Sequence, residues 1–171
     1  MPRQRPHRSK QDYQTPMNFI VAAKHRLKIR SFSFDFAADA SNTKARRWWG
    51  ESDNSLQKLP REWVHAARGG WGWLNPPFAD IEPWAVACAQ MQRAGGRVAL
   101  LIPASVGSNW FVDYVHGEAQ VLLLNGRLAF IPQHPKWLYP KDCVLALYAP
   151  RIRAVYDVWD WRAELLKKKA A

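Results

Sequence analysis

The chain has 171 residues, a length typical of one domain, and 48% of them are hydrophobic, which is enough to form a core. The chain has 25 lysines and arginines and 14 aspartates and glutamates, which gives a net charge of +11. This charge favours a polyanionic binding partner, first of all nucleic acid, and the alternative is that it only keeps the protein soluble. Two cysteines without a Cys-x-x-Cys pair and five histidines without i, i+4 spacing argue against a zinc site, and no apolar run reaches the ~20 residues of a membrane span.

The N-terminal region is expected to form a basic arm followed by a helix. Residues 1–11 carry four basic side chains and two prolines, so we expect a disordered segment that either contacts phosphates or has no role. A helix is predicted over residues 17–27, with Thr15 as its N-cap and Pro16 at its first position. Because no apolar segment follows the basic N-terminus, it is not a secretory signal, and we expect a cytoplasmic monomer.

Residues 31–39 alternate polar and aromatic side chains and then become small, which predicts a strand. The strand end carries Asp35, Ala37, Ala38 and Asp39. Small side chains allow a bound molecule to approach the backbone, and a carboxylate there can hold a ribose hydroxyl or an ammonium group. The alternative is an ordinary strand end at which Asp39 caps the next element.

The segment after this strand shows no regular pattern. It contains Arg46 and Arg47 directly before Trp48 and Trp49. Cations beside aromatic rings suit phosphate contact combined with base stacking. The same four residues also fit a pair of core tryptophans with a solvated arginine edge.

A short apolar run that ends in Asn75-Pro76-Pro77-Phe78 is the most informative stretch of the chain. Each proline fixes its own φ and pushes the preceding residue into an extended conformation, so the Asn75 side-chain oxygen and the Pro76 backbone oxygen become two acceptors at a fixed separation. Two such acceptors can bind both hydrogens of an exocyclic amino group and direct its lone pair, while Phe78 stacks on the base. The alternative is a proline-rich turn after a buried strand.

The rest of the chain alternates helices and strands. Helices are predicted at 60–68, 80–93, 108–115 and 154–166, and strands at 97–103, 119–124, 125–131 and 142–148. Because no helix fits between the last two strands, we expect them to pair antiparallel, joined by a proline-rich loop over residues 132–141. Trp84, Cys88 and Met91 share one helical face, so we interpret them as core residues.

Several motifs in this order resemble the small phage-type (Dam-like) DNA N6-adenine methyltransferases, between Tyr13 and Tyr148. They are Asp-Tyr-Gln-Thr-Pro (12–16), Asp-Phe-Ala-Ala-Asp-Ala (35–40), Trp-Trp-Gly-Glu-Ser-Asp-Asn-Ser-Leu (48–56), Asn-Pro-Pro-Phe (75–78), Leu-Ile-Pro-Ala (101–104), Asn-Trp-Phe (109–111) and Gly-Arg-Leu-Ala-Phe (126–130). The resemblance implies a class I, Rossmann-like methyltransferase fold. This fold is a three-layer α/β sandwich with a mostly parallel sheet and a terminal antiparallel hairpin, here a single domain of residues 12–166 with a basic tail at 167–171.

The resemblance also implies S-adenosylmethionine as cofactor and double-stranded DNA as substrate. The target adenine is assigned to Asn75, Pro76, Pro77 and Phe78. The cofactor-binding residues are expected to be Tyr13, Thr15, Pro16, Asp35, Ala37, Ala38 and Asp53. Asp35-Phe36-Ala37-Ala38 stands where other methyltransferases have a glycine-rich loop. DNA contacts are expected from Arg46, Arg47, Lys136 and Trp137, and no metal is expected.

These features lead to the hypothesis of an S-adenosylmethionine-dependent DNA adenine-N6 methyltransferase. Methyl transfer from a sulfonium depends on in-line approach and a directed lone pair more than on a general base. The target base must be flipped out of the duplex to reach such a site. Two alternatives remain: a methyltransferase acting on another sp² amine (cytosine N4, an RNA adenine or a protein glutamine), or a basic, tryptophan-rich nucleic-acid-binding module without activity.

Overall fold

The computed structural model describes residues 13–131 and 138–170, except for the side chains of 168–170. Five helices are present among them: α1 (Met17–Arg26), α2 (Pro60–Ala67), α3 (Glu82–Arg93), α4 (Asn109–Tyr114) and α5 (Trp161–Ala170). The strands are β1 (Phe34–Asp35), β2 (Gly72–Leu74), β3 (Val98–Pro103), β4 (Gln120–Leu124), β5 (Cys143–Tyr148) and β6 (Tyr156–Trp159). Two short 3-10 helices, η1 (Glu51–Asp53) and η2 (Ser55–Gln57), follow β1.

The strands form one six-stranded sheet in the order β1-β2-β3-β5-β4-β6. The pairs β1–β2, β2–β3 and β4–β6 are parallel, whereas β5 lies antiparallel between β3 and β4. Five strands therefore run in one direction and only β5 opposes them. This arrangement confirms the predicted α/β fold with a mostly parallel sheet.

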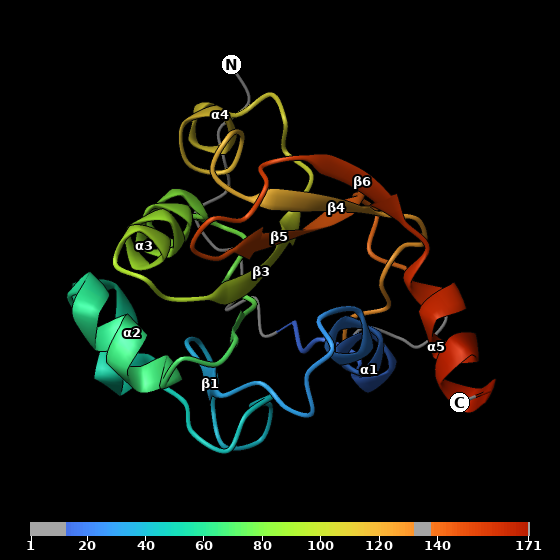
Figure 1. Cartoon of the computed structure of the whole chain (residues 1–171), viewed down its shortest axis with the longest axis horizontal. Coiled ribbons are helices and arrows are strands. Elements are labelled where there is room, and N and C mark those ends of the chain that lie inside the picture. The colour runs from blue at the N-terminus through green and yellow to red at the C-terminus, as the bar shows by residue number, and fades with distance from the viewer. Residues whose placement is uncertain (1–12, 132–137, 171) are drawn as a thin grey trace, which may run out of the picture.

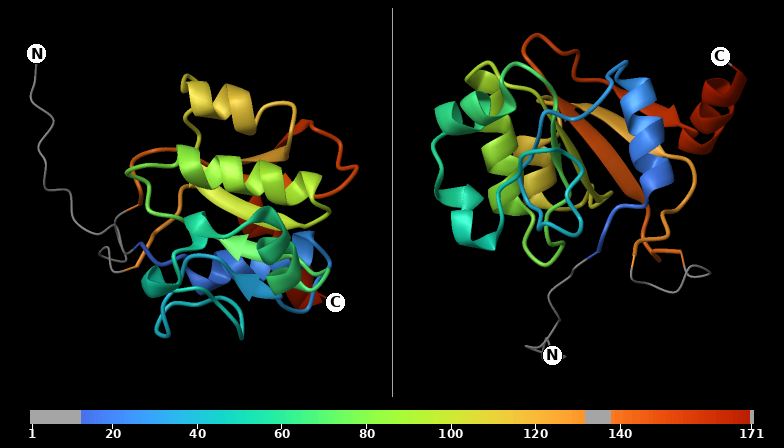
Figure 2. Two further views of the ribbon diagram at one scale, coloured as in Figure 1. Left: turned by 90° about the vertical axis from the view of Figure 1, so that its left-hand side faces the viewer. Right: turned by 90° about the horizontal axis from the view of Figure 1, so that it is seen from below.

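Helices cover both faces of the sheet and complete the three predicted layers (Figures 1 and 2). Side chains alternate between the two faces along a strand. In β3, Val98, Leu100 and Ile102 face the core shared with α2, α3 and α4, and Ala99 and Leu101 face the core shared with α1 and α5. Both faces are apolar, as expected for a strand buried in the middle of an α/β sheet.

The predicted hairpin of residues 125–131 and 142–148 is wrong in its first strand. The strand that precedes β5 in the chain and pairs with it is β4, not residues 125–131. The chain turns after it at Gly126, which has a φ of +114°, a conformation that glycine adopts without strain. Residues 125–131 then run as an irregular segment, and Ile131 forms an isolated antiparallel bridge with Gln14.

The helix predicted over 154–166 is also wrong in its first half. Residues 156–159 form β6, which pairs with β4 along its whole length. The carboxylate of Asp160 accepts hydrogen bonds from the N–H groups of Arg162 and Ala163 at 3.1 and 3.3 Å. An aspartate at a helix start satisfies otherwise unpaired N–H groups, so Asp160 marks the point where the strand ends and α5 begins.

Two predictions near the N-terminus need a smaller correction. The strand predicted at 31–39 is regular only over Phe34–Asp35. The returning segment forms isolated bridges with it at two points, from Ala45 to Phe32 and from Trp48 to Asp35. Pro16 rather than Thr15 is the N-cap of α1, and the cap forms no side-chain hydrogen bond. The Thr15 hydroxyl has a different partner, described below.

Candidate active site

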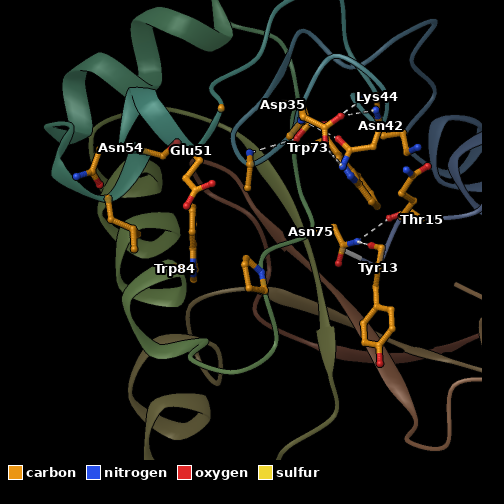
Figure 3. A pocket seen from close by; sticks show the side chains of 18 of the residues that line it. Tyr13, Thr15, Asp35, Asn42, Lys44, Glu51, Asn54, Trp73, Asn75 and Trp84 are labelled. Atoms are coloured by element: carbon orange, nitrogen blue, oxygen red, sulfur yellow. Dashed lines mark hydrogen bonds between the residues drawn. The ribbon is translucent and has the colours of Figure 1, made fainter. Parts of the chain in front are cut away.

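An open cavity of about 530 Å³ lies beyond the carboxyl ends of β1 and β2 (Figure 3). This is the end of a parallel sheet at which ligands bind, and the volume lies within the range of small-molecule sites. The cavity is lined by Tyr13, Gln14, Thr15, Asp35, Ala37, Ala38, Asp39, Asn42, Lys44, Gly50, Glu51, Asn54, Ser55, Leu56, Trp73, Asn75, Pro77, Ala79 and Trp84.

Asn75 lies directly after β2, and its amide group is oriented by the segment that precedes α1. The Nδ2 atom donates hydrogen bonds to the backbone oxygen of Tyr13 at 2.7 Å and to the hydroxyl oxygen of Thr15 at 3.0 Å. The Oδ1 atom is buried and has no hydrogen-bond partner among the described residues. A buried acceptor without a partner costs about 1–3 kcal/mol, which a donor on a ligand can recover.

The other residues of the Asn-Pro-Pro-Phe motif lie around this amide. Pro76 is buried and Pro77 is exposed on the cavity wall. Pro76 is outside the cavity lining, and none of the backbone hydrogen bonds among the described residues ends on its oxygen. Phe78 does not line the cavity.

Phe78 instead belongs to an aromatic cluster beside the site. Its ring centroid lies 6.4 Å from that of Tyr13, 5.7 Å from that of Phe130 and 5.6 Å from that of Tyr139. In Figure 3 the Asn75 oxygen points to the side on which the Tyr13 ring lies, away from Asp35.

Asp35 forms the opposite part of the cavity, at the end of β1. The residue is only 2% exposed, and its carboxylate accepts hydrogen bonds from the N–H groups of Lys44 (2.8 Å) and Ala37 (3.3 Å). Burial raises the pKa of Asp35 to about 7, although the two backbone hydrogen bonds and the Lys44 ammonium favour the charged form. The site thus contains a carboxyl group whose charge changes near neutral pH.

Most of the predicted cofactor-binding residues come together in this cavity. Tyr13, Thr15, Asp35, Ala37 and Ala38 all line it. The two remaining residues of that prediction, Pro16 and Asp53, are outside the lining set. The Asp53 carboxylate is exposed and accepts a hydrogen bond from the Gly50 N–H at 2.7 Å, which closes the turn of η1.

The segment between Asp39 and Leu56 supplies cavity residues that sequence reasoning did not identify. The polar side chains among them are those of Asn42, Lys44, Glu51, Asn54 and Ser55, and Leu56 adds apolar surface. Trp84 of α3 adds further apolar surface. Glu51 and Asn54 belong to the stretch that carries the family resemblance, so this stretch was a usable signal. Trp84 was interpreted as core, and it is half-buried with one side on the cavity.

The predicted DNA-contacting residues have different environments. Arg46 is exposed. The Arg47 guanidinium donates hydrogen bonds to the backbone oxygens of Ala66 (2.9 Å) and Ser33 (3.3 Å) and lies over the Phe34 ring, so Arg47 stabilises the edge of the fold. Lys136 and Trp137, like the predicted arm at 1–11, lie outside the described residues.

Within the described ranges, no cluster of three potential metal ligands occurs. None of the helices there is long and apolar enough to cross a bilayer.

Comparisons with known proteins add independent findings. A family model described as DNA N-6-adenine-methyltransferase (Dam) matches residues 3–141. Curated protein sequences give no significant match. Among solved structures, one described as a predicted O-methyltransferase from Agrobacterium tumefaciens is similar, with 14% identity, a TM-score of 0.44 and coverage of 82% of this chain and 84% of that one.

A second similar structure is a modification subunit assigned to a type I restriction enzyme from Vibrio vulnificus YJ016. The sequence identity is 10%, the TM-score is 0.44, and the alignment covers 93% of this chain and 52% of that one. The chain therefore spans about half the length of this second protein.

Proposed function

Because the chain belongs to the DNA N-6-adenine-methyltransferase (Dam) family, we propose that it transfers the methyl group of S-adenosylmethionine to the N6 amino group of an adenine in DNA. The observation that carries this proposal is the buried, unpaired Oδ1 atom of Asn75, beside a cavity large enough for a small cofactor. The proposal has three parts: a cofactor site, a site for the target amino group, and binding to DNA.

The charged, polar and apolar side chains that line the cavity fit S-adenosylmethionine. Its methionine part carries an ammonium and a carboxylate, which match the Asp35 carboxylate and the Lys44 ammonium on one wall. Its ribose hydroxyls match acceptors such as Glu51, and its adenine ring matches the apolar surface of Leu56 and Trp84. When bound, this cofactor supplies an electrophilic methyl group.

Asn75 and Pro76 would bind the target amino group. The two hydrogens of adenine N6 have two acceptors available, the Asn75 Oδ1 atom and the Pro76 carbonyl oxygen. Accepting both hydrogens withdraws the nitrogen lone pair from the ring and aims it at the methyl group. As N6 gains positive charge in the transition state, the same two acceptors stabilise it, and they are in position beforehand.

The aromatic cluster of Tyr13, Phe78, Phe130 and Tyr139 would receive the flipped base. Base stacking on an aromatic ring contributes roughly 1–3 kcal/mol. Since these rings pack on one another, a base that stacks on Phe78 must displace part of the cluster. The net charge of +11 supports attraction of DNA phosphates, which offsets part of the cost of base flipping.

The test is methyl transfer from S-adenosylmethionine with a labelled methyl group to unmethylated plasmid DNA, followed by nucleoside analysis. We expect the label in N6-methyladenine and a loss of about 100-fold or more for Asn75→Ala. Asn125→Ala is a suitable control, because Asn125 is exposed and outside the cavity. Label in the cytosine of the plasmid, or in RNA or protein offered in parallel reactions, would show that this group is the acceptor in place of adenine N6. Cofactor binding without transfer to any of these substrates would contradict catalysis.

A further inference from the structure

The orientation of the Asn75 amide decides whether this side chain can bind an amino group at all. An asparagine carries an oxygen acceptor and an NH₂ donor on nearly the same shape, so its neighbours determine which one faces a ligand. With Nδ2 turned toward adenine N6, two donors would meet and the lone pair would not be directed. With Oδ1 in that place, the amino group finds an acceptor.

The acceptors that fix this orientation come from a segment 60 positions earlier in the chain. Both hydrogens of the Asn75 NH₂ group are used, one by the Tyr13 carbonyl and the other by the Thr15 hydroxyl (Figure 3). Thr15 is 2% exposed, so water does not compete for its hydroxyl. With Nδ2 engaged in this way, Oδ1 is the atom left for a ligand.

The segment that holds Tyr13 and Thr15 is itself fixed on both sides. Gln14 and Ile131 exchange two backbone hydrogen bonds, of 2.6 and 3.0 Å. Pro16, which follows Thr15, is the N-cap of α1, and its carbonyl accepts hydrogen bonds from the N–H groups of Phe19 and Ile20. The two acceptors for Asn75 therefore have little freedom to move away.

We propose that Thr15 is a positioning residue of the methyl-transfer reaction, holding the Asn75 amide so that its oxygen faces the target amino group. This inference rests on the proposed function. It gives Thr15 a role that acts through Asn75 and affects the chemical step, in addition to its place on the cavity wall.

The same geometry explains why residue 75 is an asparagine. The Tyr13 carbonyl can only accept a hydrogen bond, so the side chain opposite it must donate. An ionised aspartate would bring two oxygen atoms together at this point. A protonated aspartate would donate to Tyr13 and still present a carbonyl oxygen, so Asn75→Asp should be active only when it holds a proton.

The first experiment compares Thr15→Val, which removes the hydroxyl at nearly constant shape, with Thr15→Ser, which retains it. For Thr15→Val we expect kcat for DNA methylation to fall about 10–100-fold, the range typical of residues that orient a catalytic group. Thr15→Ser, which keeps the hydroxyl that accepts from Asn75, should recover most of kcat. Equal kcat values for Thr15→Val and the parent would overturn the proposal, and so would a loss that Thr15→Ser does not recover.

A second measurement does not depend on activity. In the parent, exchange of the Asn75 side-chain NH₂ protons, measured by NMR, should be slow because both protons are hydrogen-bonded. Thr15→Val should accelerate this exchange, and unchanged exchange would overturn the positioning role even if no DNA substrate is methylated. A parent without methyltransferase activity but with the expected exchange pattern would instead refute the proposed function.

Asn75→Asp provides the third test and does not alter Thr15. Its kcat should be low at pH 8 and rise as the pH falls, whereas the parent should show no such rise over the same range. A variant with the pH profile of the parent would contradict the requirement for a donor opposite Tyr13.

Discussion

The carboxylate of Asp35 accepts a hydrogen bond from the backbone N–H of Lys44 at 2.8 Å, although the two residues are nine positions apart in the chain. The segment between them leaves the end of β1 and returns to it, so a single carboxyl group organises the loop and forms part of the cavity wall. Burial raises the pKa of this group to about 7. Its protonation state therefore links the loop, the cavity and the pH.

We predict that cofactor affinity falls as the pH decreases below about 7. An ammonium or hydroxyl group of the cofactor binds to the ionised carboxylate of Asp35. Below the pKa of Asp35 this carboxyl group is protonated, and it must lose its proton before the cofactor can bind. The Kd for S-adenosylmethionine, measured by calorimetry, should rise up to about tenfold per pH unit below that point. Asp35→Asn should bind weakly at pH 8 and lose this dependence. A parent Kd that is constant from pH 5.5 to 8 would contradict the role of Asp35.

The same group gives a prediction for stability without cofactor. Because the pKa of Asp35 in the folded state is raised from the ordinary aspartate value of 3.8, the folded protein holds a proton between about pH 4 and pH 7 that the unfolded chain has released. The free energy of unfolding should therefore have a contribution from Asp35 that is present at low pH and is lost as the pH rises to about 7. Urea unfolding should show that the free energy of unfolding of the parent decreases from pH 4 to pH 7 relative to that of Asp35→Asn. If the two proteins have the same pH dependence, Asp35 does not make this contribution.

Arg46 and Arg47 are neighbours in sequence, and we predict opposite phenotypes for their replacement. Arg46 is exposed, so Arg46→Ala should weaken DNA binding, reduce the slope of log K against log salt by about one, and leave stability unchanged. Arg47→Ala should lower the free energy of unfolding by about 1.5–3 kcal/mol, because it removes charged hydrogen bonds to Ser33 and Ala66. DNA titrations at several salt concentrations, together with urea unfolding, separate the two. The same loss of stability in both variants would contradict the assignment.

Gly72 in β2 tests how tightly the strand before Asn75 is packed. A Cβ atom at this position would overlap the ring of Phe36, which is itself fully buried. Gly72→Ala should therefore destabilise the protein by roughly 1–3 kcal/mol, the usual cost of overpacking a core. At Gly107 an added Cβ meets nothing within 4 Å, so Gly107→Ala is the matched control and should be neutral. Thermal unfolding of the two variants checks this, and equal shifts would contradict it.

The parts of the site that could be predicted from sequence are those encoded locally. The prolines after Asn75 and the small residues after Asp35 act on their immediate neighbours in the chain. Asn75 and Asp35 both line the cavity, as predicted from these local patterns. The contacts that define the chemistry are long-range. Neither the partner of Thr15, 60 positions away, nor the packing of Phe78 among other aromatic rings follows from any local pattern.

The errors in the predicted elements have the same origin. Residues 156–159 are too short a stretch to show a strand period against a helical one, and their pairing with β4 decides their conformation. The polar segment from Asp39 to Asn54 lacks periodicity because its order comes from side-chain hydrogen bonds. Asp39 accepts from Ser41 and Asn42, and Asp53 accepts from Gly50. These bonds place Lys44 and Glu51 on the cavity wall without forming a regular element.

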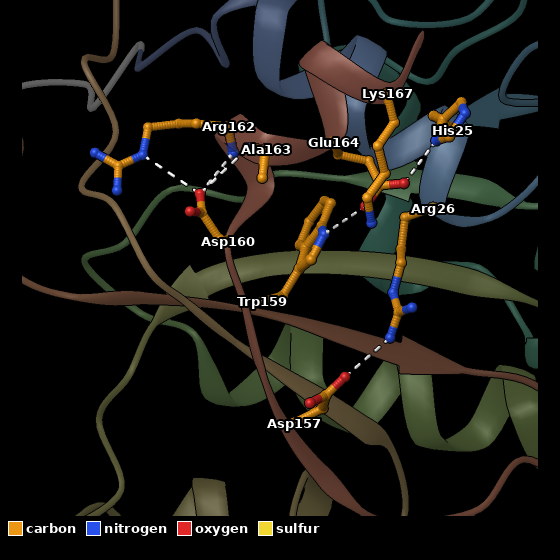
Figure 4. Close-up of polar contacts among 9 residues, drawn as sticks. All are labelled: His25, Arg26, Asp157, Trp159, Asp160, Arg162, Ala163, Glu164 and Lys167. Atoms are coloured by element: carbon orange, nitrogen blue, oxygen red, sulfur yellow. Dashed lines mark hydrogen bonds and ion pairs between the residues drawn. The ribbon is translucent and has the colours of Figure 1, made fainter. Parts of the chain in front are cut away.

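The attachment of α5 to α1 gives a final prediction. The buried carboxylate of Glu164 bonds to His25 Nδ1 at 2.6 Å and to Trp159 Nε1 at 3.2 Å (Figure 4). Burial alone would raise the pKa of Glu164, but the hydrogen bonds from His25 and Trp159 and the nearby Lys167 lower it overall. A lowered pKa means that this carboxylate stabilises the folded state above about pH 4.5 and that the stabilisation is lost at lower pH.

Glu164→Gln should therefore lower the free energy of unfolding by about 1.5–3 kcal/mol at pH 7, the usual contribution of a hydrogen bond to a charged group. The difference from the parent should be smaller at pH 3.5 than at pH 7, because the stabilisation from the parent carboxylate is lost progressively as it takes up a proton at low pH. Asp157→Asn is the control, since Asp157 pairs with Arg26 at 3.0 Å on the exposed surface, where an ion pair contributes less than about 1 kcal/mol. Urea unfolding at both pH values checks these expectations. Because Glu164 is outside the cavity lining, kcat for methyl transfer should not change, and a loss of kcat without a loss of stability would show that α5 acts on the site.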